Sequence, residues 1–105
     1  MSYQVTITRE SKAQLQSFAA TEQRVIIDGI AARLRDQPTA PSRALKPLRP
    51  NPFADYELRL GDFRILYRVD EENSEVIIVA VGRKVGNKLI VAGEEFHGHQ
   101  GNPAE

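Results

Sequence analysis

Hydrophobic and polar residues alternate on both sides of a Gly-Asp pair near the middle of the chain. Residues 56–69 read YELRLGDFRILYRV. A period of two is typical of β-strands with one buried face, and Gly-X is a two-residue hairpin turn. We therefore predict a tight β-hairpin centred on Gly61 and Asp62.

The turn also fixes the pairing of the two strands. Counting outward predicts five facing pairs: Leu60 with Phe63, Arg59 with Arg64, Leu58 with Ile65, Glu57 with Leu66, and Tyr56 with Tyr67. One face of the hairpin is then apolar and wide enough to seat helices: Tyr56, Leu58, Leu60, Phe63, Ile65, Tyr67 and Val69. The opposite face carries the charged residues Glu57, Arg59, Arg64 and Arg68.

Two arginines directly across from each other, Arg59 and Arg64, need an explanation. Like charges facing one another destabilise a strand pair, so folding does not require this arrangement. One interpretation is that both side chains are solvated and splay apart. The other is a seat for a phosphate or carboxylate, because guanidinium groups bind such anions with two hydrogen bonds and stay charged.

The N-terminal third predicts one strand and two helices. Residues 3–8 alternate as a strand, and a short helix capped by Thr8 or Ser11 follows and ends near Ala20. Thr21 is the expected cap of a second helix that runs to about Arg35. Its expected apolar stripe is Val25, Ile26, Ile27, Ile30, Ala31 and Leu34. Gly29 inside this helix indicates close packing, and we expect the two helices to form a hairpin on the sheet.

Five prolines between Pro38 and Pro52 predict a loop without regular structure. This loop also carries the basic residues Arg43, Lys46 and Arg49. It is interpreted either as a rigid rim that leads into the hairpin or as a plain connector.

The C-terminal third begins with a continuous β-branched run at residues 76–81, typical of a strand that is covered on both faces or at least central in a sheet. Gly82-Arg83-Lys84 follow it, and residues 89–91 form a last short strand or helical turn. Composition then becomes polar and glycine-rich. We expect a folded domain at residues 1–92 and a flexible polar tail at 93–105.

Composition narrows the class of protein. The 105 residues hold 14 basic and 14 acidic side chains, which argues against indiscriminate coating of nucleic acid. There is no cysteine, and no apolar run approaches membrane-spanning length. The expectation is a soluble cytoplasmic protein without a membrane partner.

The order of these elements, with the YxLRLGDFRILY hairpin and Val81-Gly82-Arg83-Lys84, resembles the RelE/ParE superfamily of toxin–antitoxin toxins, and more closely its RelE-like branch. The resemblance implies an α+β fold with an N-terminal strand and a two-helix hairpin packed on a mostly antiparallel twisted sheet of about four strands. It also implies silencing by a cognate antitoxin in a toxin–antitoxin hetero-oligomer. RelE-like members enter the ribosome and cleave mRNA without a metal or other cofactor.

In RelE-like chemistry a ribose 2′-hydroxyl attacks the neighbouring phosphate, which requires a base, an acid and cations on the developing charge. The resemblance implies catalytic, phosphate-stabilising roles for Arg59, Arg64 and either Lys84 or Arg83, and Glu57 is the candidate base. RNA binding is expected from the other basic residues, which are Arg43, Lys46, Arg49, Arg68 and Arg83. No metal site is expected.

Two departures from the RelE-like pattern keep alternatives open. Glu57 stands at a strand position that is basic in well-known RelE-like nucleases, and Ile90 stands about where a catalytic tyrosine falls. His97 or His99 could supply the missing acid, although two tail histidines without a catalytic role is the simpler interpretation. The alternative function is a ParE-like or catalytically silent toxin homologue that binds a protein such as DNA gyrase. A third interpretation is a generic α+β interaction domain with solvated arginines.

Overall fold

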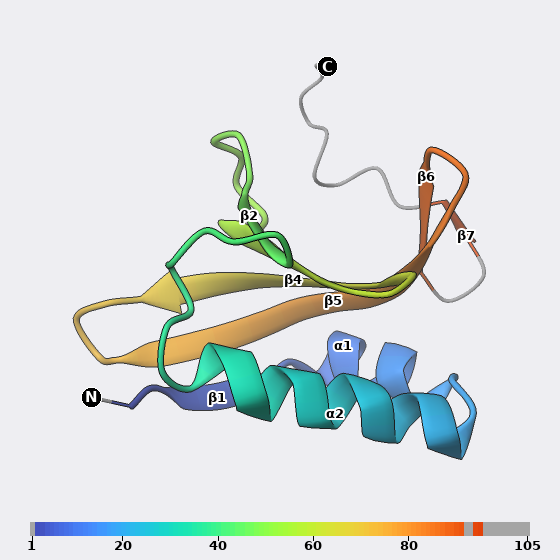
Figure 1. Cartoon of the computed structure of the whole chain (residues 1–105), viewed down its shortest axis with the longest axis horizontal. Coiled ribbons are helices and arrows are strands. Elements are labelled where there is room, and N and C mark those ends of the chain that lie inside the picture. Colours follow the sequence, from blue (N-terminus) through green and yellow to red (C-terminus); the bar gives the residue numbers. More distant parts are fainter. Residues whose placement is uncertain (1, 92–93, 96–105) are drawn as a thin grey trace.

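Two helices cover one face of a single mixed β-sheet, and in the described part of the chain no helix lies on the other face (Figure 1). The computed structural model describes residues 2–91 and 94–95. Its elements are β1 (Gln4–Ile7), α1 (Arg9–Gln16), α2 (Ala20–Leu34), β2 (Leu45–Pro47), β3 (Tyr56–Leu60), β4 (Phe63–Asp70), β5 (Glu75–Val85), β6 (Lys88–Val91) and β7 (Glu94–Glu95). Strands β2 to β7 lie side by side in chain order and antiparallel, and β1 pairs in parallel with β5.

The predicted α+β class is confirmed, but the sheet has seven strands in the described part of the chain rather than about four. Most of the difference lies in two short strands, β2 and β7, that the sequence did not indicate. β7 places Glu94 and Glu95 beside β6, although they belong to the tail that we predicted to be flexible. The rest of that tail, from residue 96 onward, lies outside the described residues.

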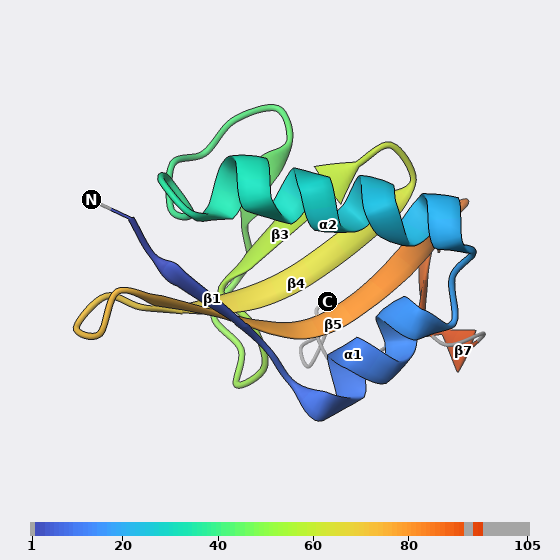
Figure 2. The ribbon, with the colours of Figure 1, turned by 90° about the horizontal axis from the view of Figure 1, so that it is seen from below.

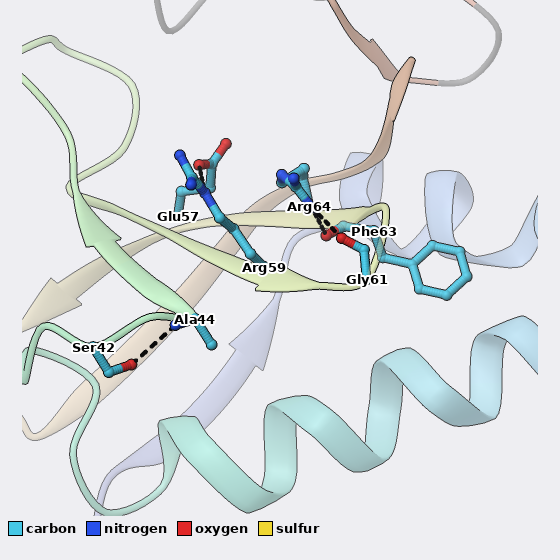
Figure 3. Close-up of polar contacts among 7 residues, drawn as sticks. All are labelled: Ser42, Ala44, Glu57, Arg59, Gly61, Phe63 and Arg64. Atoms are coloured by element: carbon cyan, nitrogen blue, oxygen red, sulfur yellow. Dashed lines mark hydrogen bonds and ion pairs between the residues drawn. The ribbon is translucent and has the colours of Figure 1, made fainter. Parts of the chain in front are cut away.

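β2 shows why the proline-containing loop nevertheless forms a strand. On the side away from β3, the N–H and the carbonyl of Leu45 both bond to Ser42, and Pro47 has no N–H to leave unpaired. The Ser42 hydroxyl also accepts a hydrogen bond of 3.2 Å from the Ala44 N–H (Figure 3). Proline is therefore tolerated in this edge strand, and the loop itself closes the edge.

The central hairpin has the predicted pairing. All five facing pairs are observed, including Arg59 opposite Arg64 and Leu58 opposite Ile65. Gly61 adopts a positive φ of 60° in the turn, a conformation that glycine reaches without steric cost. The turn residues and the alternating pattern thus determined the strand register.

The main core lies between this sheet face and the helices, both of which lie on the same side (Figure 2). α2 buries Ile26, Ile30 and Leu34, whereas Val25 and Ile27 of the predicted stripe are 51% and 50% exposed. Ala31 is exposed as well. The helical period of 3.6 lets one stripe face the sheet, so a continuous apolar run cannot be buried on all sides.

The helix ends partly match the prediction. Thr8 caps α1 by accepting a hydrogen bond from the Ser11 N–H. α2 begins at Ala20 rather than after a Thr21 cap, and the Glu22 carboxylate accepts a hydrogen bond from the Ala19 N–H. A Cβ at Gly29 would collide with the side chain of Leu60, which confirms the predicted close packing of α2.

A second, smaller core covers the middle of the face without helices. It consists of Ala54, Leu66, Ala80, Leu89 and Val91, with Leu48 and Val79 packed against it. The segment after β2 and the strand β6 rise from this face on either side (Figure 1). The helix-free face is therefore filled at its centre, and its charged residues lie around this second core.

Tyr67 connects the sheet to the loop after α2 through a hydrogen bond of its side chain. Its side chain is fully buried, and its hydroxyl donates a 2.6 Å hydrogen bond to the carbonyl oxygen of the buried Pro38. Burial, with a smaller contribution from Tyr56, raises the pKa of this hydroxyl above its usual value. The phenol therefore stays protonated and keeps donating at physiological pH.

Replacing Tyr67 with phenylalanine is expected to lower the free energy of unfolding by about 1–2 kcal/mol. The cause is the Pro38 carbonyl, which would remain buried without a donor. Urea denaturation followed by circular dichroism measures the change. Tyr56→Phe is the matched control, because the Tyr56 ring stacks on Tyr67 but its hydroxyl bonds to no described residue. An equal loss in both variants would contradict this explanation.

Candidate anion-binding site

Three charged side chains, Glu57, Arg59 and Arg64, lie on the helix-free side of the β3–β4 hairpin, pointing away from α2 (Figure 3). Strand alternation places them there because Leu58 and Ile65 between them point into the main core. The predicted juxtaposition of Arg59 and Arg64 on one face is therefore present in the structure.

Arg64 is the unusual member of this group because it is only 9% exposed. One terminal nitrogen, Nη1, donates to the carbonyl oxygens of Gly61 at 2.7 Å and Phe63 at 2.9 Å. Its remaining N–H groups make no hydrogen bond to a described residue, and within that part of the chain no carboxylate lies within 4.0 Å. Burying a charge without a counter-charge costs several kcal/mol, so this guanidinium is suited to an anionic ligand.

Arg59, in contrast, already has an anionic partner. Its Nε donates to the Glu57 carboxylate at 2.9 Å, and the Arg59 and Glu57 side chains are 43% and 14% exposed. Glu57 also faces Lys46 of β2 in the strand register. The Glu57 carboxylate is thus held within reach of Arg59, on the same sheet face as Arg64.

A β-bulge in β5 determines which of two neighbouring cations joins this face. Tyr67 pairs with Ile78 but Leu66 pairs with Ala80, so Val79 is an extra residue in the strand. The bulge is fixed by α1, because the Ser11 hydroxyl donates to the Ile78 carbonyl at 2.9 Å. One extra residue in a strand places each later side chain on the sheet face opposite to the one that strict alternation would give.

Beyond the bulge, Gly82 is the cross-strand partner of Arg64, and Arg83 is the cross-strand partner of Phe63. Lys84 therefore shares the helix-free face with Arg64, as its diagonal neighbour, and its side chain is exposed. Its N–H donates to the Asp62 carbonyl at 2.7 Å, which ties β5 to the hairpin turn. Of the two cations that the sequence offered at this position, Lys84 lies on the same sheet face as Arg64 and Arg83 does not.

Arg83 lies on the opposite, helix-covered face and is paired there. Its Nη2 donates to Glu22 of α2 at 2.8 Å. Its guanidinium carbon lies 5.4 Å from the ring centre of Phe18 and 5.1 Å from that of Phe63. The predicted RNA-binding residue Arg83 is therefore not brought together with Arg59 and Arg64, because the bulge changes its face.

The hydrogen bond from Arg83, together with that from the Ala19 N–H, holds the pKa of the Glu22 carboxyl below its usual value. A lowered folded-state pKa means that the unfolded chain binds the proton more readily. The stabilisation from Glu22 is therefore complete above the ordinary glutamate pKa and is lost as pH falls through the folded-state value.

We expect the stability of the Glu22→Gln variant to fall less steeply than that of the wild type as the pH is lowered below about 5. Melting temperatures of the wild type and the variant across pH 3–7 test this, and their difference should shrink as the pH falls. A difference that stays constant with pH would show that the charge of Glu22 is not the cause.

The remaining predicted RNA-binding residues are more scattered. Arg43 is exposed in the loop before β2, and Lys46 joins the site face opposite Glu57. Arg49 lines a surface pocket of about 480 Å³ together with Asp55 and Glu71, away from Arg64. Arg68 is on the helix-free face but lies beyond Leu66, on the far side of the second core.

The remaining sequence predictions concern the tail histidines, metal binding and membrane crossing. His97 and His99 lie outside the described residues. Within the described chain no group of three or more histidine, cysteine or acidic residues could hold a metal ion, and no described helix is long and apolar enough to cross a membrane. The run at residues 76–81 indicated a strand covered on both faces, which agrees with the second core, but it did not indicate the bulge, because it has no alternation that could mark one.

The chain is similar to toxins of known type. Residues 5–85 match the family model described as the ParE toxin of the type II toxin–antitoxin system, parDE. Toxin RelG of Mycobacterium tuberculosis is 29% identical over 84 residues, which cover 80% of this chain and 93% of RelG.

Solved structures share the fold. The toxin–antitoxin complex RelBE2 of M. tuberculosis contains a chain with a TM-score of 0.68 and 27% identity, covering 80% of this chain and all of that one. The RelE–RelB complex of Pyrococcus horikoshii gives a TM-score of 0.64 at 23% identity, covering 79% and 96% of the two chains. A mutant of E. coli toxin RelE in the free state gives 0.64 at 20% identity, covering 79% and 84%.

Proposed function

Because the chain belongs to the RelE/ParE superfamily of type II toxin–antitoxin toxins, we propose that it is a ribosome-dependent mRNA endonuclease that blocks translation without a metal. The observation that carries this proposal is Arg64, a guanidinium that is 9% exposed and has no carboxylate partner among the described residues. A backbone phosphate of RNA would supply the missing negative charge. The ribosome would present the mRNA.

The proposed reaction is intramolecular transesterification. Glu57 removes the proton of a ribose 2′-hydroxyl, whose oxygen forms a bond to the adjacent phosphorus while the bond from phosphorus to the 5′-oxygen breaks. The departing 5′-oxygen takes up a proton from a general acid or from water. Arg64, Arg59 and Lys84 stabilise the extra charge on the phosphate oxygens. The ion pair of 2.9 Å between Arg59 and Glu57 keeps base and cation side by side before substrate binds.

The surrounding basic residues are proposed to guide the RNA strand. Lys46 lies on the site face beside Glu57, and Arg43 is exposed in the loop before β2. Arg49 and Arg68 extend the basic surface beyond the second core. Such contacts add affinity that depends on salt and not on sequence.

We also propose that a cognate antitoxin binds this chain and forms a hetero-oligomer with it. Two of the similar structures, from M. tuberculosis and P. horikoshii, are toxin–antitoxin complexes. Co-expression of the neighbouring reading frame should restore growth of cells that produce the toxin.

The second candidate is a ParE-like toxin that acts on a protein such as DNA gyrase. Two observations favour it. The matching family model is that of the ParE toxin, and all three tyrosines lie on the helix-covered side, so the described part of the site face offers no tyrosine or histidine as general acid. His97 and His99 would have to supply that acid from the tail, or water would have to do so.

Pulse labelling of cells after induction separates the two candidates. Within minutes of induction, the endonuclease should stop incorporation of labelled methionine while incorporation of labelled thymidine continues. The opposite order would favour the gyrase-type target. Glu57→Gln should remove the translation block if Glu57 is the base, and Glu72→Gln, which removes an exposed carboxylate from the β4–β5 turn, is the matched control.

A further inference from the structure

On the helix-covered face, Arg83 contacts residues from three segments of the chain, although its side chain is 39% exposed. Glu22 of α2 accepts its hydrogen bond at 2.8 Å, and the rings of Phe18 and Phe63 lie 5.4 Å and 5.1 Å from its guanidinium carbon. The two rings also contact each other edge to face at 5.6 Å. Arg83 thus joins the start of α2, the connection between the helices and the first residue of β4.

Phe63 connects these contacts of Arg83 to the opposite face of the sheet. Its side chain lies under Arg83, while its carbonyl oxygen accepts a hydrogen bond from Arg64 at 2.9 Å. The neighbouring Gly61 carbonyl accepts the second bond from the same nitrogen, at 2.7 Å. Fixing Phe63 from one side therefore fixes the acceptors that orient Arg64 on the other side.

We propose that Arg83 is a positioning residue that holds Phe63, and through it the β3–β4 turn, so that the Arg64 guanidinium is oriented for an anion. This inference rests on the proposed role of Arg64 as an anion ligand. Arg83 itself does not contact the anion, because it lies on the other sheet face and its charge is paired with Glu22.

The effect of Glu22→Gln on RNA affinity distinguishes a positioning role of Arg83 from direct binding of RNA by Arg83. If Arg83 bound RNA, removing the charge of Glu22 would free that cation and raise RNA affinity. If Arg83 positions the turn, Glu22→Gln loosens the guanidinium and lowers affinity, although it removes a negative charge. The two roles therefore predict changes of opposite sign.

The experiment compares Glu22→Gln and Arg83→Met with two charge-matched controls, Glu72→Gln and Arg24→Met, whose parent side chains are exposed. The first measurement is the NMR signal of the Arg64 Nε–H group in the free protein, assigned by its loss in Arg64→Lys. The second is the affinity for a short single-stranded RNA with a 2′-O-methyl group at each position, which lacks the attacking hydroxyl and cannot be cleaved. Melting curves identify a temperature at which every variant is folded.

We expect the Arg64 Nε–H signal to shift or broaden in Glu22→Gln and Arg83→Met and to stay unchanged in both controls. Affinity for the uncleavable oligonucleotide should fall about threefold to tenfold in each of the two test variants. In an Arg64→Lys background the same substitutions should have little further effect, because they act through Arg64.

Two results would overturn the inference. One is an Arg64 signal that is identical in the wild type and both test variants. The other is a higher RNA affinity for Glu22→Gln. If the wild type does not bind the oligonucleotide without ribosomes, the NMR comparison in the free protein decides the positioning role by itself. Cleavage of mRNA in a translation reaction then tests the proposed nuclease function separately.

Discussion

Growth inhibition by this toxin is expected to disappear when Arg64 is replaced by lysine or alanine. The guanidinium is buried, fixed by the Gly61 and Phe63 carbonyls, and has no carboxylate partner in the described chain. Its remaining N–H groups are suited to phosphate oxygens. Removing one preorganised donor from such a site lowers reaction rates by about 10²–10³-fold.

Arg64→Lys is the more informative of the two substitutions. It keeps the positive charge but loses the planar guanidinium group, which can donate hydrogen bonds to two carbonyl oxygens and to an anion at the same time. Arg24→Lys is the matched control, because Arg24 is exposed on α2 and lies outside the proposed site. Colony counts after induction measure the effect, and thermal melts confirm that each variant is folded. Full toxicity of a folded Arg64→Lys protein would remove Arg64 from the mechanism.

Gly82→Ala is expected to disrupt the sheet beside the same site. A Cβ at this position would lie 2.5 Å from the Ile90 carbonyl oxygen and 2.7 Å from Cγ2 of Val91. The nearest atom belongs to the backbone of β6, so β6 must move as a whole. Forcing an extra methyl group into such a contact costs about 1–3 kcal/mol. For a chain of this size, that lowers the melting temperature by about 5–20 °C.

Gly29→Ala provides the comparison for this effect. A Cβ at Gly29 would collide only with the side chain of Leu60, which is half-buried and can change rotamer. Alanine also favours the helix by about 1 kcal/mol over glycine. The two melting temperatures should therefore differ clearly, with Gly82→Ala the less stable. Similar values would show that the close approach of β6 at Gly82 does not matter for folding.

The sequence specified the hairpin better than any other part of the fold. A Gly-X turn and strict alternation on both sides allow one register, and Arg59 opposite Arg64 followed from counting. The helices were predicted as elements, but their buried stripes were narrower than the apolar runs suggested. Val25 and Ile27 are exposed because a helix can turn only one side to the sheet.

The faces of Arg83 and Lys84 could not be predicted, because they depend on the bulge at Val79. That residue lies in a uniform apolar run, and the group that fixes the bulge, the Ser11 hydroxyl, is 67 residues away in the chain from the Ile78 carbonyl that it contacts. The strand β2 was missed for a related reason. Pro47 argues against a strand, and only tertiary pairing with β3 shows that its nitrogen faces the free edge.

The most direct test of the proposed function is primer extension on a defined mRNA in a cell-free translation reaction. The wild type and Arg64→Lys are each added with and without ribosomes. The proposal predicts cuts within codons that require ribosomes, appear with the wild type and are absent with Arg64→Lys. An intact message with the wild type, beside an active control toxin, would contradict the endonuclease function and favour a ParE-like protein target.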